Sequence, residues 1–382
     1  MTTTEKAAPQ SPVPVTPQRS PLQRFVTAGL APALPGRGGS TLLRHLIWVA
    51  VGAVAVYFIS YGIEPFRNYQ LATVAAYLCV TVGLTMLTGM NGQLSLGHGA
   101  FMACGAYTVA LMQNEFSDRN ILGNWTLLVS LPLGVLVASI AGVVIGMCAA
   151  RLRGPYLAGV TLAVALVVPA FTTRFASVFN ADQGLSVYIA PAPAGLGPYF
   201  PPERWLAWIA IICAMVAVLL IANLVRSRFG RSFKAVRDDE VAARLCGIHV
   251  ARTQVLAFVV SAACAGLGGG VLAVISSSVS PSVFGLTLSL NLLLAIVLGG
   301  LGSLFGAAWG ALLLVVLPYA TTELARSFEM SPGMANKLEG NLPLAIFGLT
   351  LIIVMLLAPG GIQGAFRKAG FAIRRRLHAR RT

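Results

Sequence analysis

Charge is scarce in this chain of 382 residues: only 10% are Asp, Glu, Lys or Arg, whereas apolar residues make up 57%. A soluble globular domain carries about 25% charged residues, so the composition excludes an ordinary soluble protein. Several apolar stretches exceed the ~18 residues that indicate a membrane span. We therefore predict an all-α fold, a polytopic integral membrane helical bundle with interrupted, glycine-rich helices.

The chain also lacks the short motifs of common enzyme and metal sites. It contains no GxxxxGK[ST] phosphate loop, no GxSxG nucleophile elbow and no HExxH pair. Its six cysteines include no CxxC pair, and five fall in apolar stretches, so we expect reduced, buried thiols. We predict no catalytic residue, no metal site and no cofactor, and hence a chain that is not an enzyme.

Ten apolar stretches are predicted to cross the membrane. They are 46–63, 71–88, 92–112, 125–150, 155–178, 205–225, 254–278, 286–301, 306–322 and 342–357. The stretch 92–112 opens with polar and glycine residues, so it either crosses fully or re-enters on one side. None of the ten carries a charged residue at its centre. Ion-coupled carriers usually need such groups, which argues against a stand-alone secondary carrier or a charge-selective channel.

The basic residues are distributed unevenly over the predicted loops. With the N-terminus inside, 21 of the 27 Lys and Arg residues fall on the inner side, whereas eight of the 12 acidic residues fall outside. By the positive-inside rule, both termini are cytoplasmic in a multi-pass protein of the plasma membrane. Anionic membrane lipid attracts the basic face, so we expect lipid contact and no nucleic-acid partner.

Composition divides the chain into three regions. Residues 1–41 are rich in Pro, Thr, Ser and Gln and are predicted to form a disordered cytoplasmic tail. Residues 42–364 form the predicted transmembrane domain, and 365–382 form a basic cytoplasmic tail. Two glycine-rich stretches, 89–107 and 299–314, interrupt apolar runs within the transmembrane domain. They indicate either close helix packing alone or an internal repeat around a central pathway.

The segment 226–253 is a charged inner loop between two apolar stretches, and it holds ten of the 39 charged residues. It predicts a short helix with an acidic N-terminal cap, an i,i+4 ion pair, a glycine at its end and a narrow apolar stripe of Val241, Leu245 and Ile248. Its consecutive acids favour docking to a cytoplasmic partner over attachment to lipid headgroups. The residues predicted to couple the membrane domain to that partner are Arg237, Asp238, Asp239, Glu240, Arg244 and Gly247.

Five neutral polar residues lie at membrane depth, where a buried polar group needs a partner. Each either lines a substrate path or forms hydrogen bonds between helices. For the histidine, a core residue with satisfied hydrogen bonds is favoured over a metal ligand, because no second metal-binding residue is near it. The candidates for the path are Asn91, Gln93, Ser95, His98 and Asn291.

Five segments of the chain occur together and in a characteristic order. They are LTGMNGQLSLGHGAFMACGAY (87–107), LRGPYLAGVTLA (152–163), FKAVRDDEVAARLCGIHVARTQVLAFVVSAACAGLGGG (233–270), LNLLLAIVLGGLGSLFGAAWGALLLVVLP (290–318) and LPLAIFGLTLIIVMLLAPGGIQG (342–364). Together they resemble the LivM-type permease of branched-chain amino acid ABC importers. The resemblance implies a LivH-type second permease, two ABC ATPase subunits and an extracytoplasmic substrate-binding protein as partners. It also implies that AVRDDEVAARLCGI (235–248) meets an ATPase.

The expected function is that of a permease subunit of an ATP-binding cassette importer for branched-chain amino acids. Movement of the partner ATPases would push the inner-loop helix as a rigid lever against the bundle. An importer for urea or short amides is the alternative within the same machinery, because the resemblance does not fix the substrate. A stand-alone carrier or channel is the third hypothesis, and the docking loop argues against it.

Overall fold

The computed structural model describes most of the predicted transmembrane domain. The described residues are 60–119, 125–152, 154–189, 200–327 and scattered residues at 52–58 and 346–367. All of them belong to the unit Gly36–Thr382. The predicted tail 1–41, nearly all of 365–382 and much of the predicted spans 46–63 and 342–357 lie outside the described residues.

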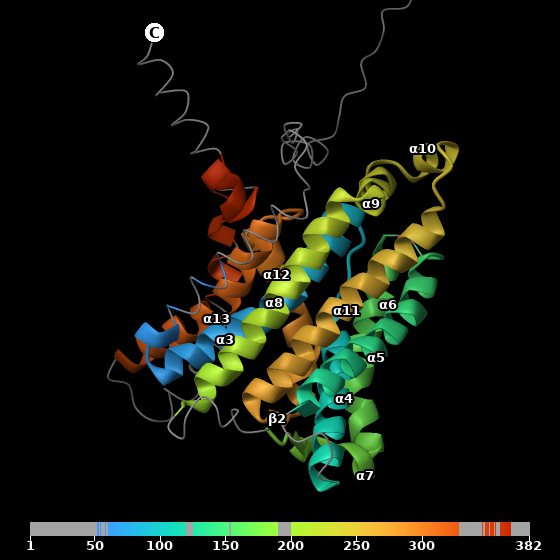
Figure 1. The fold of residues 1–382 in the computed structure, drawn as a ribbon. Coiled ribbons are helices and arrows are strands. Elements are labelled where there is room, and N and C mark those ends of the chain that lie inside the picture. Colours follow the sequence, from blue (N-terminus) through green and yellow to red (C-terminus); the bar gives the residue numbers. More distant parts are fainter. Residues whose placement is uncertain are drawn as a thin grey trace, which may run out of the picture. The chain divides into compact units, whose positions relative to one another are not determined.

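The described residues are almost entirely helical (Figure 1). The α-helices are α3 (Pro65–Leu84), α4 (His98–Asp118), α5 (Thr126–Ala149), α6 (Pro155–Arg174), α7 (Ala176–Phe179), α8 (Pro202–Arg226), α9 (Arg228–Asp238), α10 (Glu240–Leu245), α11 (Val250–Ser276), α12 (Leu286–Gly299) and α13 (Leu304–Ser327). A π-helix, η1 (Thr85–Met90), continues α3 without a break. The remaining elements are the 3-10 helices η3 (Ala181–Gln183) and η5 (Pro281–Phe284) and the strands β1 (Leu185–Ser186) and β2 (Ser278–Val279).

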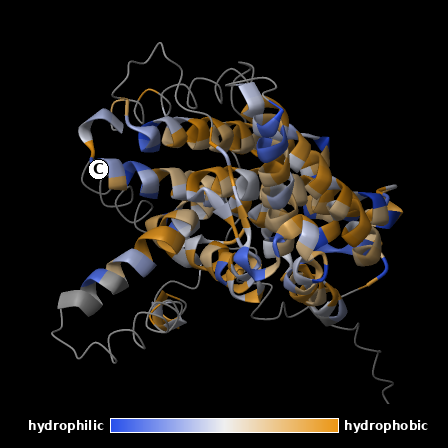
Figure 2. Cartoon of the chain, turned by 90° about the horizontal axis from the view of Figure 1, so that it is seen from below, coloured by the Kyte–Doolittle hydropathy of each residue, from blue (hydrophilic) through white to orange (hydrophobic). Residues whose placement is uncertain are grey.

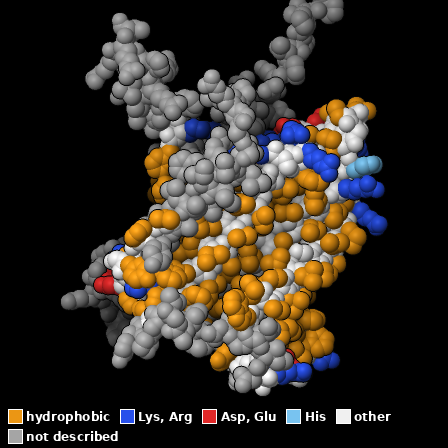
Figure 3. Space-filling view, in the orientation of Figure 1, with side chains coloured by type: hydrophobic (Ala, Val, Ile, Leu, Met, Phe, Trp, Pro, Cys, Tyr) orange, Lys and Arg blue, Asp and Glu red, His pale blue; other side chains and the backbone are white. Residues whose placement is uncertain are grey.

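Five helical segments in the described part are long and apolar enough to cross a membrane. They are Pro65–Met90, Thr126–Ala149, Tyr156–Arg174, Pro202–Arg226 and Val250–Ser276. Hydrophobic residues run along most of the length of the helices, and the hydrophilic residues gather mainly near helix ends (Figure 2). The surface in Figure 3 is correspondingly apolar between two more polar ends. A helical membrane protein with at least five spans is thus confirmed, and the count of ten stays a prediction.

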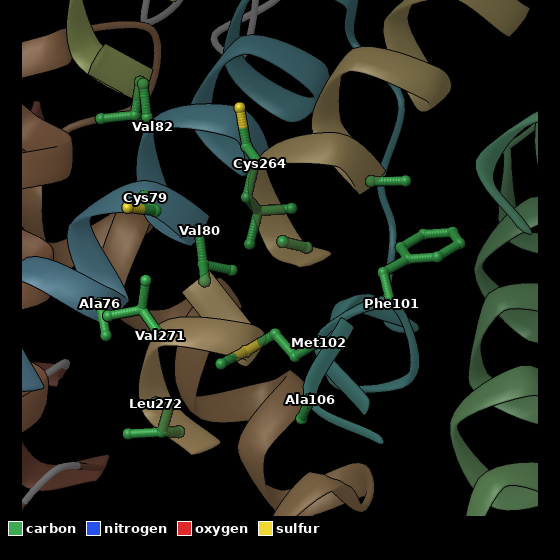
Figure 4. Close-up of a cluster of buried hydrophobic side chains, with 14 of the residues drawn as sticks. Ala76, Cys79, Val80, Val82, Phe101, Met102, Ala106, Cys264, Val271 and Leu272 are labelled. Atoms are coloured by element: carbon green, nitrogen blue, oxygen red, sulfur yellow. The ribbon is translucent and has the colours of Figure 1, made fainter. Parts of the chain in front are cut away.

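Helix α11 lies at the centre of the packing, where it contacts α3, α4, α5 and α8. Most of its residues are buried, as expected for a helix that is apolar on all sides. A Cβ on Gly269 would overlap the Met102 carbonyl oxygen of α4, so the two backbones touch there. The apolar side chains at this three-helix contact are seen in Figure 4, among them Ala76, Cys79 and Val80 of α3, Met102 and Ala106 of α4, and Val271 and Leu272 of α11.

The predicted span 92–112 is not one regular helix. Residues 92–97 form irregular backbone between η1 and α4, and the helix begins only at His98. Gly92 has a φ of 77°, a left-handed conformation that glycine adopts without steric cost. The glycine-rich stretch 89–107 therefore contains an interrupted helix, as its composition predicts.

Residues 185–188, which follow η3, are held against two other parts of the chain. Strand β1 pairs antiparallel with β2, with Leu185 opposite Val279. This two-residue pair is a small addition to a fold that is otherwise helical in the described residues, as predicted. The Asn114 amide near the end of α4 donates to the Ser186 carbonyl at 2.7 Å and accepts from the Tyr188 backbone nitrogen at 3.1 Å. These contacts tie β1 to both α4 and the residues after α11.

The cysteines differ in their exposure. Cys79 and Cys264 are buried in the contact between α3 and α11, as expected for apolar core thiols. Cys148 and Cys246 are exposed, so the prediction of buried thiols is wrong for these two. The first lies on the outward side of α5, and the second follows the short helix α10.

The contact between α4 and α11 generates a test of stability. Gly269→Ala should destabilise the protein by about 1–3 kcal/mol, because the new Cβ has no space beside the Met102 carbonyl. Gly159→Ala is the matched control, since a Cβ at Gly159 meets nothing within 4 Å. The measurement is thermal unfolding of both purified variants in the same detergent. Equal unfolding temperatures for the two variants would contradict the close contact.

Candidate coupling and translocation sites

The segment 226–253 is largely helical, in contrast to the predicted loop with a single short helix. Helix α8 continues to Arg226, and α11 begins at Val250 rather than at residue 254. Between them lie α9 and α10, joined at Asp239. The charged segment is therefore a pair of short helices that connects the long helices α8 and α11.

The sequence prediction omits α9, although a signal for this helix is present. Phe229, Phe233 and Val236 recur at helical spacing, and the last two are buried against the bundle. Ser227 precedes them and caps the helix, because its hydroxyl accepts a hydrogen bond from the Phe229 backbone nitrogen at 3.1 Å. An amphipathic helix with a Ser cap is thus encoded among the arginines at 226, 228, 231 and 237.

The predicted short helix is confirmed as α10. One carboxylate oxygen of Asp239 accepts hydrogen bonds from the backbone nitrogens of Val241 at 2.7 Å and Ala242 at 3.1 Å. Asp239 is therefore the N-terminal cap, and Asp238 is not. Gly247 follows the helix with a φ of 79°, which suits a left-handed C-terminal cap.

Arg237 at the end of α9 points into the bundle rather than toward solvent. Its Nη1 donates to the Gly89 carbonyl oxygen in η1 at 2.9 Å, and its Nη2 lies 2.8 Å from a carboxylate oxygen of Asp238. The Arg237 side chain is only 14% exposed, whereas that of Asp238 is 63% exposed. The pair thus orients a nearly buried guanidinium onto the glycine-rich stretch 89–107.

Glu240 attaches α10 to α11 in a similar way. Its Oε1 accepts a hydrogen bond from Gln254 Nε2 at 3.1 Å, and its Oε2 lies 3.6 Å from Arg244 Nη2. Gln254 is buried on α11 and is absent from the predicted coupling residues. The i,i+4 pair is confirmed, but its acid also anchors the short helix to the long one.

The three residues of the predicted apolar stripe differ in their exposure. Val241 and Leu245 are 64% and 85% exposed, whereas Ile248 packs beside a small buried cluster of Val236, Ala243 and Val250. Lys and Arg side chains gather at the same end of the molecule as α9 and α10 (Figure 3). Arg237 and Glu240 attach this segment to the bundle, and Val241 and Leu245 give α10 an exposed apolar surface.

His98 is a buried residue with both ring nitrogens in hydrogen bonds. Nδ1 lies 3.0 Å from the Ser95 hydroxyl, and Nε2 lies 2.7 Å from the Ser261 hydroxyl on α11. All three side chains are fully buried. The arrangement joins the start of α4 to α11, which is the core histidine that the sequence favours over a metal ligand.

Two of the other candidates carry an unused hydrogen-bond acceptor. The Asn91 amide nitrogen donates to Gln93 Oε1 at 2.9 Å, but Asn91 Oδ1 is buried without a partner among the described residues. Asn291 Oδ1 on α12 is likewise buried without a partner among the described residues. The hydroxyls of Thr85 and Thr88 in η1, which the sequence prediction omits, are also buried and unpaired in the described part. The feature that distinguishes these two threonines is the π-helical backbone of η1, in which both lie.

The chain is similar to known membrane transport proteins. Residues 68–358 match the family described as branched-chain amino acid transport system / permease component. The LivM permease proteins of Salmonella typhimurium and Escherichia coli K12 are each 31% identical over 354 residues, which cover 86% of this chain and 77% of each relative. The LivH permease protein of Salmonella typhimurium is 26% identical over 298 residues, 76% of this chain and 92% of the relative. No solved structure matches the chain.

The histidine contact can be tested through Ser261→Ala. The variant should lose about 1–3 kcal/mol of stability, because it leaves a fully buried His98 nitrogen without a partner. Ser276→Ala is the matched control on the same helix, since that hydroxyl bonds only to local carbonyl oxygens. Thermal unfolding in detergent measures both. A loss as large in the control as in Ser261→Ala would show that the interhelical bond adds nothing.

Proposed function

Because the chain belongs to the family of branched-chain amino acid transport permeases, we propose that α9 and α10 receive the movement of an ATPase and pass it to the membrane helices. The chain is the permease component of a branched-chain amino acid ABC transport system and is itself non-catalytic. What its coupling segment contacts, and which residues meet the substrate, belong to the proposal.

The exposed tip of α10 is the observation that carries the coupling proposal. Val241 and Leu245 present apolar surface at the end of the molecule that holds the basic residues. A soluble ATPase with an apolar groove would bury these side chains, and each buried aliphatic side chain contributes roughly 1.5–3 kcal/mol. Arg237, Asp238, Asp239, Glu240, Arg244 and Gly247 then serve to shape the helix and attach it to the bundle.

The proposed assembly contains two ABC ATPase subunits, a LivH-type second permease and an extracytoplasmic substrate-binding protein. The similarity to LivH proteins supports the second permease, because two chains related to each other can form a pseudo-symmetric pathway. Several helices also expose large apolar side chains, such as Ile140 on α5 and Ile212 on α8, which lipid or the second permease would cover.

We propose that α9 and α10 lie on the cytoplasmic side, together with both termini. Two basic segments that are distant in sequence support this orientation, since Arg151 after α5 and Arg252 at the start of α11 line one surface pocket. A shared membrane face for the segment 226–253 and residue 151 agrees with the positive-inside rule for cytoplasmic loops.

For the substrate path, we propose Asn91 and Asn291, with Gln93 orienting the first amide. Their buried, unpaired carbonyl oxygens can accept hydrogen bonds from the ammonium group of an amino acid. Ser95 and His98 instead hold α4 to α11, because their polar atoms are occupied by each other and by Ser261. A branched-chain substrate needs few polar contacts, and a path without described charges at its centre suits a zwitterion of no net charge.

The docking proposal predicts a defect in assembly. Replacing Val241 and Leu245 together by Asp should release the ATPase subunits from the purified complex and abolish leucine uptake, because two charges cannot enter an apolar groove. Cys246→Ser is the matched control, being an exposed neighbour of the same helix. Affinity purification from the membrane in mild detergent measures the retained subunits. Full retention by the double variant would refute docking through α10.

The path proposal predicts a defect in transport without a loss of stability. Asn291→Leu should lower leucine uptake about tenfold or more, since it removes a hydrogen bond to a charged group. It should not lower the unfolding temperature, because the Asn291 oxygen is already unpaired in the described part. Leu290→Ala, a partly exposed neighbour on α12, is the control.

Uptake by proteoliposomes that contain the whole importer is the measurement for these variants. Excess unlabelled urea should leave leucine uptake unchanged, and effective competition by urea would favour the urea or short-amide alternative. Normal uptake by Asn291→Leu, with a lower unfolding temperature, would assign the amide to helix packing instead.

A further inference from the structure

The two glycine-rich stretches, which lie about 200 residues apart in sequence, meet at one point. A Cβ on Gly89 in η1 would overlap the backbone nitrogen of Gly302, which lies in the turn between α12 and α13. Nothing larger than glycine fits at position 89 without moving that turn. The contact is therefore made by backbone against backbone, with no flexible side chain between the two segments.

The turn on the other side of this contact is itself closely fitted. Gly300 and Gly302 have φ values of 119° and 78°, which other residues rarely adopt. A Cβ on Gly302 would lie 3.3 Å from the Gly89 oxygen. A Cβ on Gly361 would lie 2.6 Å from the Gly300 Cα. The residues after the predicted last span thus pack on the same turn.

Arg237 meets this contact from the coupling segment. Its Nη1 donates to the carbonyl oxygen of Gly89, the residue that touches Gly302. Its aliphatic part lies across Gly92, where a Cβ would come within 2.8 Å of Arg237 Cγ. The guanidinium also pairs with Asp238, so its position is set on two sides. One arginine therefore links α9 to the meeting point of both glycine-rich stretches.

The backbone around Gly89 is suited to movement. Gly89 lies in the π-helix η1, a form that is rare and occurs frequently at functional sites. Residues 92–97 follow as irregular backbone and end at His98, which is fixed to α11 through Ser261. Asn91 and Gln93, proposed for the substrate path, lie between these two fixed points. A displacement of Gly89 must alter the position of that connection.

We propose that the contact between Gly89 and Gly302 is where the movement of α9 and α10 enters the membrane domain, and that Arg237 is the positioning residue that delivers it. This inference rests on the proposed function, because it needs an ATPase acting on α10. The proposal assigns the same role, the transmission of this movement, to both glycine-rich stretches. Through Gly89 the movement reaches the connection to α4, and through Gly302 it reaches α12 and α13.

The experiment uses the complete importer in proteoliposomes and measures ATP hydrolysis and leucine uptake on the same sample. Arg237→Ala should retain its ATPase subunits and continue to hydrolyse ATP, while the uptake per ATP falls about tenfold or more, since a charged hydrogen bond is lost. Arg237→Lys should recover part of the coupling, because it keeps one charged donor without the planar fork. Arg231→Ala is the matched control, since this arginine is exposed on the same helix.

Gly89→Ala tests the same contact from the opposite side. Its Cβ should push the turn at Gly302 away and reduce uptake per ATP in the way that Arg237→Ala does. Gly159→Ala, with open space around its Cβ, is the control. If Arg237→Ala fails to accumulate in the membrane, Arg237→Lys and Gly89→Ala decide the question.

The outcomes separate this inference from the docking proposal. Wild-type uptake per ATP in Arg237→Ala, or in Gly89→Ala, would overturn the role of the contact. Loss of the ATPase subunits from Arg237→Ala would also overturn it, because the arginine would then act in docking. By contrast, retention of the ATPase subunits by the Val241 and Leu245 double variant would refute docking through α10, whatever the arginine variants do.

Discussion

Glycine contacts fix how closely the helices of this protein approach one another. Inside a membrane, lipid is as apolar as a leucine side chain, so helices gain their association mainly from packing and hydrogen bonds. Helix α11 meets α4 at Gly269 and α5 at Gly266, where a Cβ would overlap atoms of the neighbouring helix. These contacts set the distances at which polar side chains of one helix reach the next, as His98 on α4 reaches Ser261 on α11.

Irregular backbone at membrane depth is possible here because its polar groups find partners on the closely packed helices. The Leu96 nitrogen between η1 and α4 donates to the Thr161 hydroxyl at 3.0 Å, and the Gly99 nitrogen in the first turn of α4 donates to the Ser289 hydroxyl at 2.9 Å. His98 completes the set through Ser261. Most polar atoms of this region thus serve the fold. The amide oxygens of Asn91 and Asn291, like the hydroxyls of Thr85 and Thr88, have no partner among the described residues, and the two amides are therefore the ones proposed for the substrate path.

The parts of the fold that were predictable from the sequence are those that depend on local pattern. Apolar length gives α5, α8 and α11, and capping chemistry gives α10. Helix α9 escapes prediction because the arginines around its apolar residues resemble a solvated loop. The pairing of β1 with β2 and the inward direction of Arg237 depend on residues distant in sequence, so no local pattern contains them. The two glycine-rich stretches were recognisable, but their meeting at Gly89 and Gly302 was not.

In the proposed coupling, the shortness of α10 determines how its movement reaches the bundle. An isolated helix of six residues is not stable in water, so α10 depends on the Asp239 cap, on the bond between Glu240 and Gln254 of α11, and on the burial of Ala243. A force on the exposed side chains of α10 therefore cannot bend this helix without breaking these bonds. The force passes instead to the helices to which α10 is bonded. One route leads through Gln254 into the central helix, and the other through Arg237 to Gly89. Both proposed routes begin on the same short segment, so the proposal implies that α11 and η1 move together, as in a rigid rotation of packed helices.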